Sequence, residues 1–226
     1  EMLRSLVGSE MCIRDSYGGT VDVIGFGPLS AEDVMKETLT YGIDDAFLIS
    51  DSQFADMDVS QVAKIVAAVI KKLGPYDLVL CGRQAIDGDS AHMASMTSCA
   101  LEIPLIAYSD EITEMKDGSV FATCMGDQMA YKVEAKTPAM ILSIREKNKN
   151  RFPSVPDIMK TYDGTYKTKI LTNEDLNFSV TKRKVTQLRK YEVKSSKQQK
   201  LVMIGGKDEE EKAAQILQLL KQKSVI

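Results

Sequence analysis

The chain has little of the chemistry that most metal-binding and catalytic sites require. Its 226 residues include one histidine and four cysteines. The cysteines lack CxxC spacing and have no partner histidine at ligand spacing, so no metal site is expected from these residue types. So few cysteines suit a reducing cytoplasm better than a disulfide framework. The sequence therefore predicts a cytoplasmic protein without a bound metal.

Long apolar runs and a strong net charge are also missing. No apolar run approaches the roughly 20 residues that a membrane span needs, and no signal-peptide pattern is visible. The formal net charge of −3 gives no global reason to bind nucleic acid. Two basic clusters, Lys182-Arg183-Lys184 and Lys194–Lys200, come without an aromatic platform or a recognised nucleic-acid module. We expect no nucleic-acid partner and a solvated basic segment.

The first residues stand apart from the rest of the chain. The run Met11-Cys12-Ile13-Arg14-Asp15-Ser16 is what one reading frame of a transposase sequencing adapter encodes. Such scars are set aside before fold reasoning. We therefore expect residues 1–16 to be an artefact, with natural sequence from about Tyr17. The alternative is an ordinary polar N-terminal tail.

Short apolar runs alternate with stretches of helical periodicity, which predicts βαβ units and a parallel sheet. We expect strands at 21–25, 46–49, 78–81, 105–108 and 139–144, and helices at about 30–41, 60–73 and 91–101. The run 78–81 has the pattern of the most buried strand. Ser30 is expected to cap the first helix, with its inner face formed by Ala31, Val34, Met35 and Leu39.

After Tyr108 the pattern changes to alternating segments around 112–115, 120–125 and 129–133, which predict antiparallel hairpins with a turn at Asp117-Gly118. From Thr161 to Lys200 the chain is polar and lacks core periodicity. A final helix is expected from about Asp208 to Lys221, with acidic residues in its first turn. We expect an α/β domain at 17–160, then an arm and terminal helix at 161–226 that docks on a partner subunit.

The most informative stretch follows the strand expected at 78–81. A glycine, Gly82, opens a polar loop in which Asp87 and Asp89 flank a second glycine, Gly88. Glycine lets a backbone approach a ligand, and free N–H groups at the next helix start favour an anion. Ser90 can donate a hydroxyl to a phosphate, whereas the two carboxylates are suited to hold the loop or reach a sugar hydroxyl. On spacing alone, a nucleotide site and a plain solvated turn both remain open.

Three blocks of sequence, in order, carry a family resemblance. They are Gly25-Phe26-Gly27-Pro28, the run Gly82-Arg83-Gln84-Ala85-Ile86-Asp87-Gly88-Asp89 with Ile103-Pro104 after it, and Asn148–Lys160. The last block has the form N-x-x-R-[FY]-x-x-x-P-x-I-M-K. Together they resemble the β subunit of electron transfer flavoproteins, from about Gly19 to the C-terminus.

The resemblance implies a Rossmann-like sheet of the adenine-nucleotide hydrolase type, with helices on both faces. It implies a non-catalytic electron carrier that forms a heterodimer with an FAD-binding α subunit. Electrons would come from flavin dehydrogenases such as acyl-CoA dehydrogenases. The β subunit's own ligand would be AMP, or a second FAD in bifurcating relatives. The first strand and helix of the family would be missing here, which would leave neighbouring strand edges unpaired.

The resemblance also implies the residues of the nucleotide site. They are Phe26 and the continuous run Gly82, Arg83, Gln84, Ala85, Ile86, Asp87, Gly88, Asp89, Ser90, Ala91, His92, Met93 and Ala94. The run departs from the family at His92, Met93 and Ala94, where relatives commonly have Gln, a small apolar residue and Gly. Ala94 adds a methyl group where close backbone approach is expected. Phe26 is equally compatible with a core aromatic at a strand end.

The third block resembles the family's partner-recognition loop. Its candidate residues are Arg151, Phe152, Pro153, Ser154, Val155, Pro156, Ile158 and Met159. The two prolines reduce the entropy lost when such a loop is ordered on binding. Val155 takes the place of a leucine that can anchor the loop in relatives. The alternative is a rigid surface loop without a partner.

Two other classes of protein share the expected sheet. One is an adenine-nucleotide-binding stress-type module without a redox role. The other is an adenylating enzyme, which would need a glycine-rich pyrophosphate loop after the first strand. The polar arm and the block Arg151–Met159 argue against both.

Overall fold

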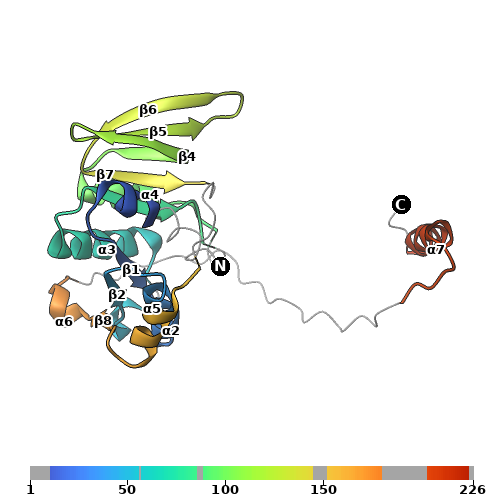
Figure 1. Ribbon diagram of the computed structural model, residues 1–226, viewed down its shortest axis with the longest axis horizontal. Helices are drawn as coiled ribbons and strands as arrows, with labels where there is room; N and C mark the ends of the chain where they lie inside the picture. Colours follow the sequence, from blue (N-terminus) through green and yellow to red (C-terminus); the bar gives the residue numbers. More distant parts are fainter. Residues whose placement is uncertain (1–10, 56, 86–88, 145–151, 180–202, 224–226) are drawn as a thin grey trace. The chain divides into compact units, whose positions relative to one another are not determined.

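The computed structural model describes residues 11–55, 57–85, 89–144, 152–179 and 203–223. The chain divides into two units, with the boundary between Arg183 and Lys184, and each unit is described by itself. The first unit has an α/β fold with parallel strands and packed helices (Figure 1). No helix among the described residues combines the length and the apolar character that crossing a membrane requires.

One sheet of the first unit is parallel throughout. Its strands pair in the order β1-β2-β8, with bounds Asp22–Phe26, Asp45–Ile49 and Thr168–Leu171. Successive side chains of β2 point to opposite faces, because the side-chain period of a strand is two. Leu48 packs with α2 (Glu32–Leu39), and Ile49 packs with α3 (Val59–Leu73). The two helices therefore cover opposite faces of β2.

A second sheet joins parallel and antiparallel strands. Its order is β3-β7-β4-β5-β6, with bounds Leu78–Gly82, Ala139–Ser143, Leu105–Lys116, Ser119–Met125 and Ala130–Lys136. The first three strands are parallel, and β4, β5 and β6 form the predicted antiparallel hairpins, which Figure 1 shows side by side. Asp117 and Gly118 have φ angles of 52° and 72°, as a tight hairpin turn requires. The prediction of hairpins with this turn is confirmed.

The remaining described helices and 3-10 turns are shorter than α3. In the first unit these are α4 (Met93–Leu101), α5 (Val155–Tyr162), α6 (Asn173–Leu176) and the 3-10 turns η1 (Leu29–Ala31) and η2 (Ser52–Phe54). In the second unit, α7 spans Glu209–Gln222, and the Asp208 carboxylate accepts a hydrogen bond from the Glu211 N–H at 2.8 Å. The predicted terminal helix with an acidic first turn is confirmed.

The burial of β3 differs from its sequence pattern. All five residues of β3 are half-buried, whereas four of the five residues of β7 are fully buried. In the described part of the chain β3 pairs with β7 alone, so its other edge has no strand beside it. The prediction that this apolar run forms the most buried strand is therefore wrong.

The start of α2 also differs from its prediction. Ser30 lies in η1 and makes no capping hydrogen bond to the helix, which begins at Glu32. The inner face is formed by Met35 and Leu39, each 2% exposed, while Val34 is 45% exposed. Residues 35 and 39 lie one turn apart on one face, and residue 34 is rotated about 100° away from them. Ser30 as a cap and Val34 as a core residue are both corrected.

A strand lies in the polar stretch that begins at Thr161. Thr161 itself is buried, and β8 pairs in parallel with β2. The Lys169 ammonium lies 2.7 Å from the Asp45 carboxylate, and Ile170 is 40% exposed. As an edge strand, β8 buries little, so polar residues suffice and no apolar alternation marks it in the sequence.

The observed boundaries of α4 and β4 also differ from the predicted ones. Ala91 has a φ angle of 53°, which a helix does not accept, so α4 begins at Met93 and not at the predicted position 91. β4 continues through the two strand segments expected at 105–108 and 112–115, with an irregular register and a left-handed Tyr108 where they join.

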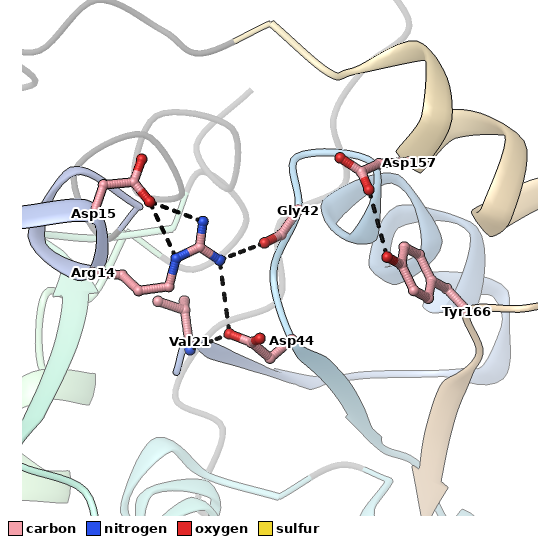
Figure 2. A network of polar contacts seen from close by, with 7 residues as sticks. All are labelled: Arg14, Asp15, Val21, Gly42, Asp44, Asp157 and Tyr166. Carbon is pink, nitrogen blue, oxygen red and sulfur yellow. Dashed lines mark hydrogen bonds and ion pairs between the residues drawn. The ribbon is translucent and has the colours of Figure 1, made fainter. Parts of the chain in front are cut away.

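Residues 11–17 are helical, and this segment packs against α2. Met11 is 1% exposed and belongs to the core cluster that holds Met35 and Leu39. The Arg14 side chain contacts the loop between α2 and β2 (Figure 2). Its guanidinium donates to the Gly42 carbonyl at 2.6 Å and lies 3.8 Å from the Asp44 carboxylate. The interpretation of residues 1–16 as an artefact stays a prediction, and residues 1–10 lie outside the described residues.

Replacing Met11 tests whether this segment belongs to the folded domain. Because its side chain is buried in the core cluster, Met11→Ala is expected to lower the free energy of unfolding by about 2–5 kcal/mol. Met129→Ala is the control, since Met129 is 58% exposed and its loss is expected to cost less than about 0.5 kcal/mol. Urea denaturation measures both. Equal, small changes would show that residues 11–16 do not contribute to the fold.

Tyr76 gives a second test, at high pH. Its hydroxyl donates to the Asp22 carboxylate at 2.5 Å, and burial, with a smaller contribution from that hydrogen bond, raises the pKa of Tyr76. The raised pKa stabilises the fold below the unfolded value of about 10, and this contribution is lost as the pH rises above it. Tyr76→Phe is expected to cost about 1 kcal/mol at pH 7 and to remove this alkaline loss.

Denaturation of wild type and Tyr76→Phe between pH 7 and pH 11 measures the effect. Tyr131→Phe serves as the control, because that residue is 51% exposed on β6. If wild type and Tyr76→Phe lost stability in parallel above pH 10, the buried hydrogen bond would not exist in solution.

Candidate functional site

The loop after β3 is held by contacts between its two described ends. The Asp89 N–H donates to the Ala85 carbonyl at 2.9 Å, and the Gln84 side-chain amide donates to the Asp89 carboxylate. The Arg83 side chain donates to the Gln84 amide oxygen at 3.0 Å. Asp89 thus fixes the loop conformation, one of the two roles that the sequence suggests for it. The other carboxylate and its neighbours, Ile86, Asp87 and Gly88, lie outside the described residues.

The start of α4 offers backbone donors to an anion. Its N-cap residue, His92, is exposed and makes no capping hydrogen bond, and the first turn contains no acidic residue. The first N–H groups of a helix lack intrahelical partners and carry partial positive charge. Asp89 and Ala91, with φ angles of 46° and 53°, turn the backbone just before this helix. Exposed Ser90 lies between them.

The predicted residues around this loop fall into two groups. Ser90 and His92 are exposed beside the uncapped helix start, where they can reach a ligand. Ala94 is 3% exposed and packs with Met140 and Leu142 of β7. The methyl group that distinguishes Ala94 from glycine therefore lies in the core, so only its backbone can face a ligand.

Phe26 is placed at the carboxyl end of β1. Its ring centroid lies 6.1 Å from that of Phe54, and both belong to the core cluster around Ile49. Phe26 also lines a cavity of about 490 Å³ that Cys81 and Met93 line as well. The structure therefore brings Phe26 to the same cavity as the end of β3 and the start of α4. Its packing against Phe54 is that of a core aromatic, and its contact with a nucleotide stays a prediction.

A second group of candidate residues surrounds α5. Ser154 caps this helix by accepting the Asp157 N–H at 3.1 Å, and Pro156 occupies its first turn, where the missing N–H has no cost. Pro153 and Ile158 are half-buried, and Arg151 lies outside the described residues.

One face of α5 and the residue before it are apolar and exposed. The exposed fractions are 88%, 69%, 65% and 72% for Phe152, Val155, Met159 and Tyr162. We call these four residues the α5 stripe. Positions 155, 159 and 162 follow helical spacing, so they share one face. The sequence reasoning missed Tyr162, although the spacing of four and three residues from Val155 was visible.

The opposite side of α5 is fixed to the domain. Thr161 lies on this side and is buried, with its hydroxyl donating to the Asp157 carbonyl of the same helix at 2.8 Å. The Tyr166 hydroxyl donates to the Asp157 carboxylate at 3.5 Å, and the Tyr166 ring packs on the core cluster of Met35 and Leu39 (Figure 2). The stripe is thus presented by a helix with an anchored inner face.

No group of three or more His, Cys, Asp or Glu side chains is arranged to hold a metal ion within the described ranges. All four cysteines are free thiols, with Cys124 buried and Cys12 and Cys99 exposed. Burial raises the pKa of Cys124, which makes it a poor nucleophile.

Comparison with known proteins gives a consistent result. The electron transfer flavoprotein domain family matches residues 11–170. The β subunit of an electron transfer flavoprotein from Thermoanaerobacterium thermosaccharolyticum is 38% identical over 165 residues, which cover 73% of this chain and 62% of the relative. The corresponding subunit from Clostridium acetobutylicum is 33% identical over 221 residues, covering 96% of this chain and 83% of the relative.

A third relative belongs to a larger assembly. It is the caffeyl-CoA reductase–Etf complex subunit CarD of Acetobacterium woodii, 35% identical over 171 residues that cover 75% of this chain and 64% of the relative. The chain thus spans less than two thirds of the length of two of these three relatives. The family match nevertheless covers most of the chain, and the similarity to β subunits extends through both candidate sites. The chain therefore belongs to the electron transfer flavoprotein β-subunit family.

Proposed function

We propose that this chain works as the β subunit of an electron transfer flavoprotein. In this role it binds an adenine nucleotide, AMP or a second FAD, and pairs with an α subunit that holds FAD. The observation that carries the proposal is the uncapped start of α4, without an acidic first turn, directly after the loop Gly82–Asp89. Family membership supports the same function.

The residues present fit a nucleotide phosphate. The Met93 and Ala94 N–H groups of the first turn of α4 would donate to phosphate oxygens, and the Ser90 hydroxyl would add a further donor. The Asp89 carboxylate keeps the loop in place through Gln84. As part of this proposal, the parallel strands form a Rossmann-like sheet that places the site at its carboxyl edge.

FAD supplies reversible one- and two-electron chemistry when it is bound. This chain needs no catalytic residue for that chemistry, since its part is to position the cofactor-holding subunit and set the flavin's surroundings. A cytoplasmic location belongs to the same proposal and agrees with four free thiols.

The α5 stripe is the proposed contact for a flavin dehydrogenase, such as an acyl-CoA dehydrogenase. Exposed Met and aromatic side chains are enriched at protein interfaces. Because Asp157 of α5 is bonded to Tyr166, whose ring packs on the core cluster of Met35 and Leu39, the stripe loses little conformational entropy when a partner covers it. An adenine-nucleotide-binding module without a redox role has no use for such a surface, which favours the electron-transfer function.

Changing His92 tests the nucleotide site. His92→Asp is expected to cap α4 and place a negative charge where a phosphate would bind, weakening AMP binding about tenfold or more while raising the free energy of unfolding by about 1 kcal/mol. His92→Gln, which neither caps well nor adds charge, is expected to keep wild-type affinity. Isothermal titration with AMP measures both in complexes with the co-expressed α subunit. Equal affinities of both variants would place the nucleotide elsewhere.

Changing Met159 tests the partner contact. Met159→Glu puts a charge into the α5 stripe and is expected to lower kcat/KM for electron transfer from the dehydrogenase about tenfold, with unchanged flavin content and melting temperature. Met129→Glu is the matched control, because Met129 is comparably exposed but lies in the β5–β6 turn. A loss of the same size in both variants would show a general charge effect and contradict a specific contact.

A further inference from the structure

The α5 helix has little of its own to hold it in place. It spans eight residues, Val155–Tyr162, and isolated helices shorter than about 12–15 residues are marginal in water. Of these eight residues, all of which the structure describes, Thr161 alone is buried. Three apolar side chains of the helix, at positions 155, 159 and 162, are instead exposed in the α5 stripe. The direction of the stripe therefore depends on contacts other than the burial of an apolar face.

The chain folds back directly after α5. The Asp163 carboxylate accepts the Thr165 N–H at 2.8 Å, and Gly164 has a φ angle of 87°. Glycine takes such a left-handed φ without steric cost, because it lacks a Cβ atom. The Tyr166 N–H then donates to the carbonyl of Lys160, in the last turn of α5, at 2.9 Å. This turn places the Tyr166 side chain beside the helix.

The Tyr166 side chain joins α5 to the core. Its ring packs on the cluster of Met35 and Leu39. Its hydroxyl donates to the Asp157 carboxylate at 3.5 Å and accepts from the Lys160 ammonium at 3.4 Å, two bonds that one hydroxyl can make at once. The same ammonium lies 5.5 Å from the centre of the Tyr166 ring, which is within the range of a cation–π contact.

The two residues that Tyr166 contacts lie on the side of α5 opposite the stripe. Positions 157 and 160 are three residues apart and so share one face of the helix. At 3.6 residues per turn, the middle of this face is about 160° from the middle of the stripe formed by positions 155, 159 and 162. Asp157 lies in the first turn and Lys160 in the last. Contacts at both ends of one face fix the rotation of α5 about its own axis.

Asp157 also ties α5 to the loop after α2. One of its carboxylate oxygens accepts the Ser154 hydroxyl at 2.5 Å, which closes the start of the helix. The same oxygen would lie 3.5 Å from a Cβ atom placed on Gly42, so the carboxylate lies against this loop (Figure 2). The Tyr166 hydroxyl bonds the other oxygen. Asp157 is therefore held between the helix cap, the loop and Tyr166.

We propose that Tyr166 is a positioning residue of the partner contact, because its hydroxyl sets the rotation at which α5 presents the stripe to a flavin dehydrogenase. This inference rests on the function proposed above for the α5 stripe. Tyr166 acts through Asp157 and Lys160. Without its hydroxyl α5 takes several rotations, and the apparent affinity for the partner falls by the fraction of molecules that keep the correct one.

Tyr166→Phe, in the complex with the co-expressed α subunit, tests the proposal. The variant keeps the ring on the core cluster and removes the hydroxyl alone. If about a fifth of the molecules keep the correct rotation, the KM for electron transfer from the dehydrogenase rises about fivefold. The kcat and flavin content are expected to stay unchanged, and the melting temperature to stay within about 3 °C of wild type.

Tyr41→Phe is the matched control, since the Tyr41 ring packs on the same core cluster. It is expected to keep the wild-type KM. Equal changes of KM in the two variants would overturn the proposal. A joint loss of kcat, flavin content and melting temperature in Tyr166→Phe would show a structural role and would overturn it as well.

Hydrogen–deuterium exchange of the same complexes, without dehydrogenase, gives a second reading. In Tyr166→Phe the amides of 158–162 are expected to exchange at least fivefold faster, while those of α3 keep the wild-type rate. Tyr41→Phe is expected to leave both segments unchanged. Wild-type exchange of 158–162 in Tyr166→Phe would contradict the positioning role.

Met159→Glu separates this inference from the function on which it rests. If Met159→Glu lowers kcat/KM while Tyr166→Phe keeps the wild-type KM, the stripe is the partner contact and Tyr166 does not position it. If Tyr166→Phe speeds exchange in α5 while neither variant changes KM, the stripe is not the partner contact, and both proposals are wrong.

Discussion

The constraint on which the first unit depends is that a parallel strand needs hydrogen-bonding neighbours along its edges. Among the residues that the structure describes, β2 and β7 have neighbours on both sides and are buried, whereas β1 and β3 each have one neighbour and face a shared cavity. The contacts around that cavity are made by side chains and helices. Tyr76 reaches from one sheet to Asp22 in the other, and the Tyr17 hydroxyl accepts the Met115 N–H at 3.2 Å. These contacts and the packing of α3 against α4 link two sheets that share no strand pair in the described part of the chain.

The same two strands also set the geometry of the proposed nucleotide site. Phe26 ends β1 and Gly82 ends β3, so the distance between these two strands sets how far Phe26 lies from the loop and from the start of α4.

The sequence pattern predicted the helices and strands that have one clearly apolar face. It did not predict the edge strand β8 or the conformation of the turn before α4. Met35 and Leu39 were identified as core residues because they repeat with helical spacing. Val34 is also apolar, but it lies on the exposed side of α2. β8 was missed because an edge strand with Lys169 and few buried side chains carries no alternation. The loop residues were proposed as a nucleotide site because their sequence resembles that of the family. The conformation that matters there, left-handed Asp89 and Ala91, depends on tertiary packing that no spacing rule encodes.

The two candidate sites rest on different parts of the core. α4 packs Ala94 on Met140 and Leu142 of β7, whereas α5 is anchored through Tyr166 on the cluster of Met35 and Leu39. Substitutions without shared contacts act almost additively on stability and binding. A change at the start of α4 should therefore leave the α5 stripe in place, and the reverse should also hold. The exposed face of α5 can therefore change without altering the loop before α4.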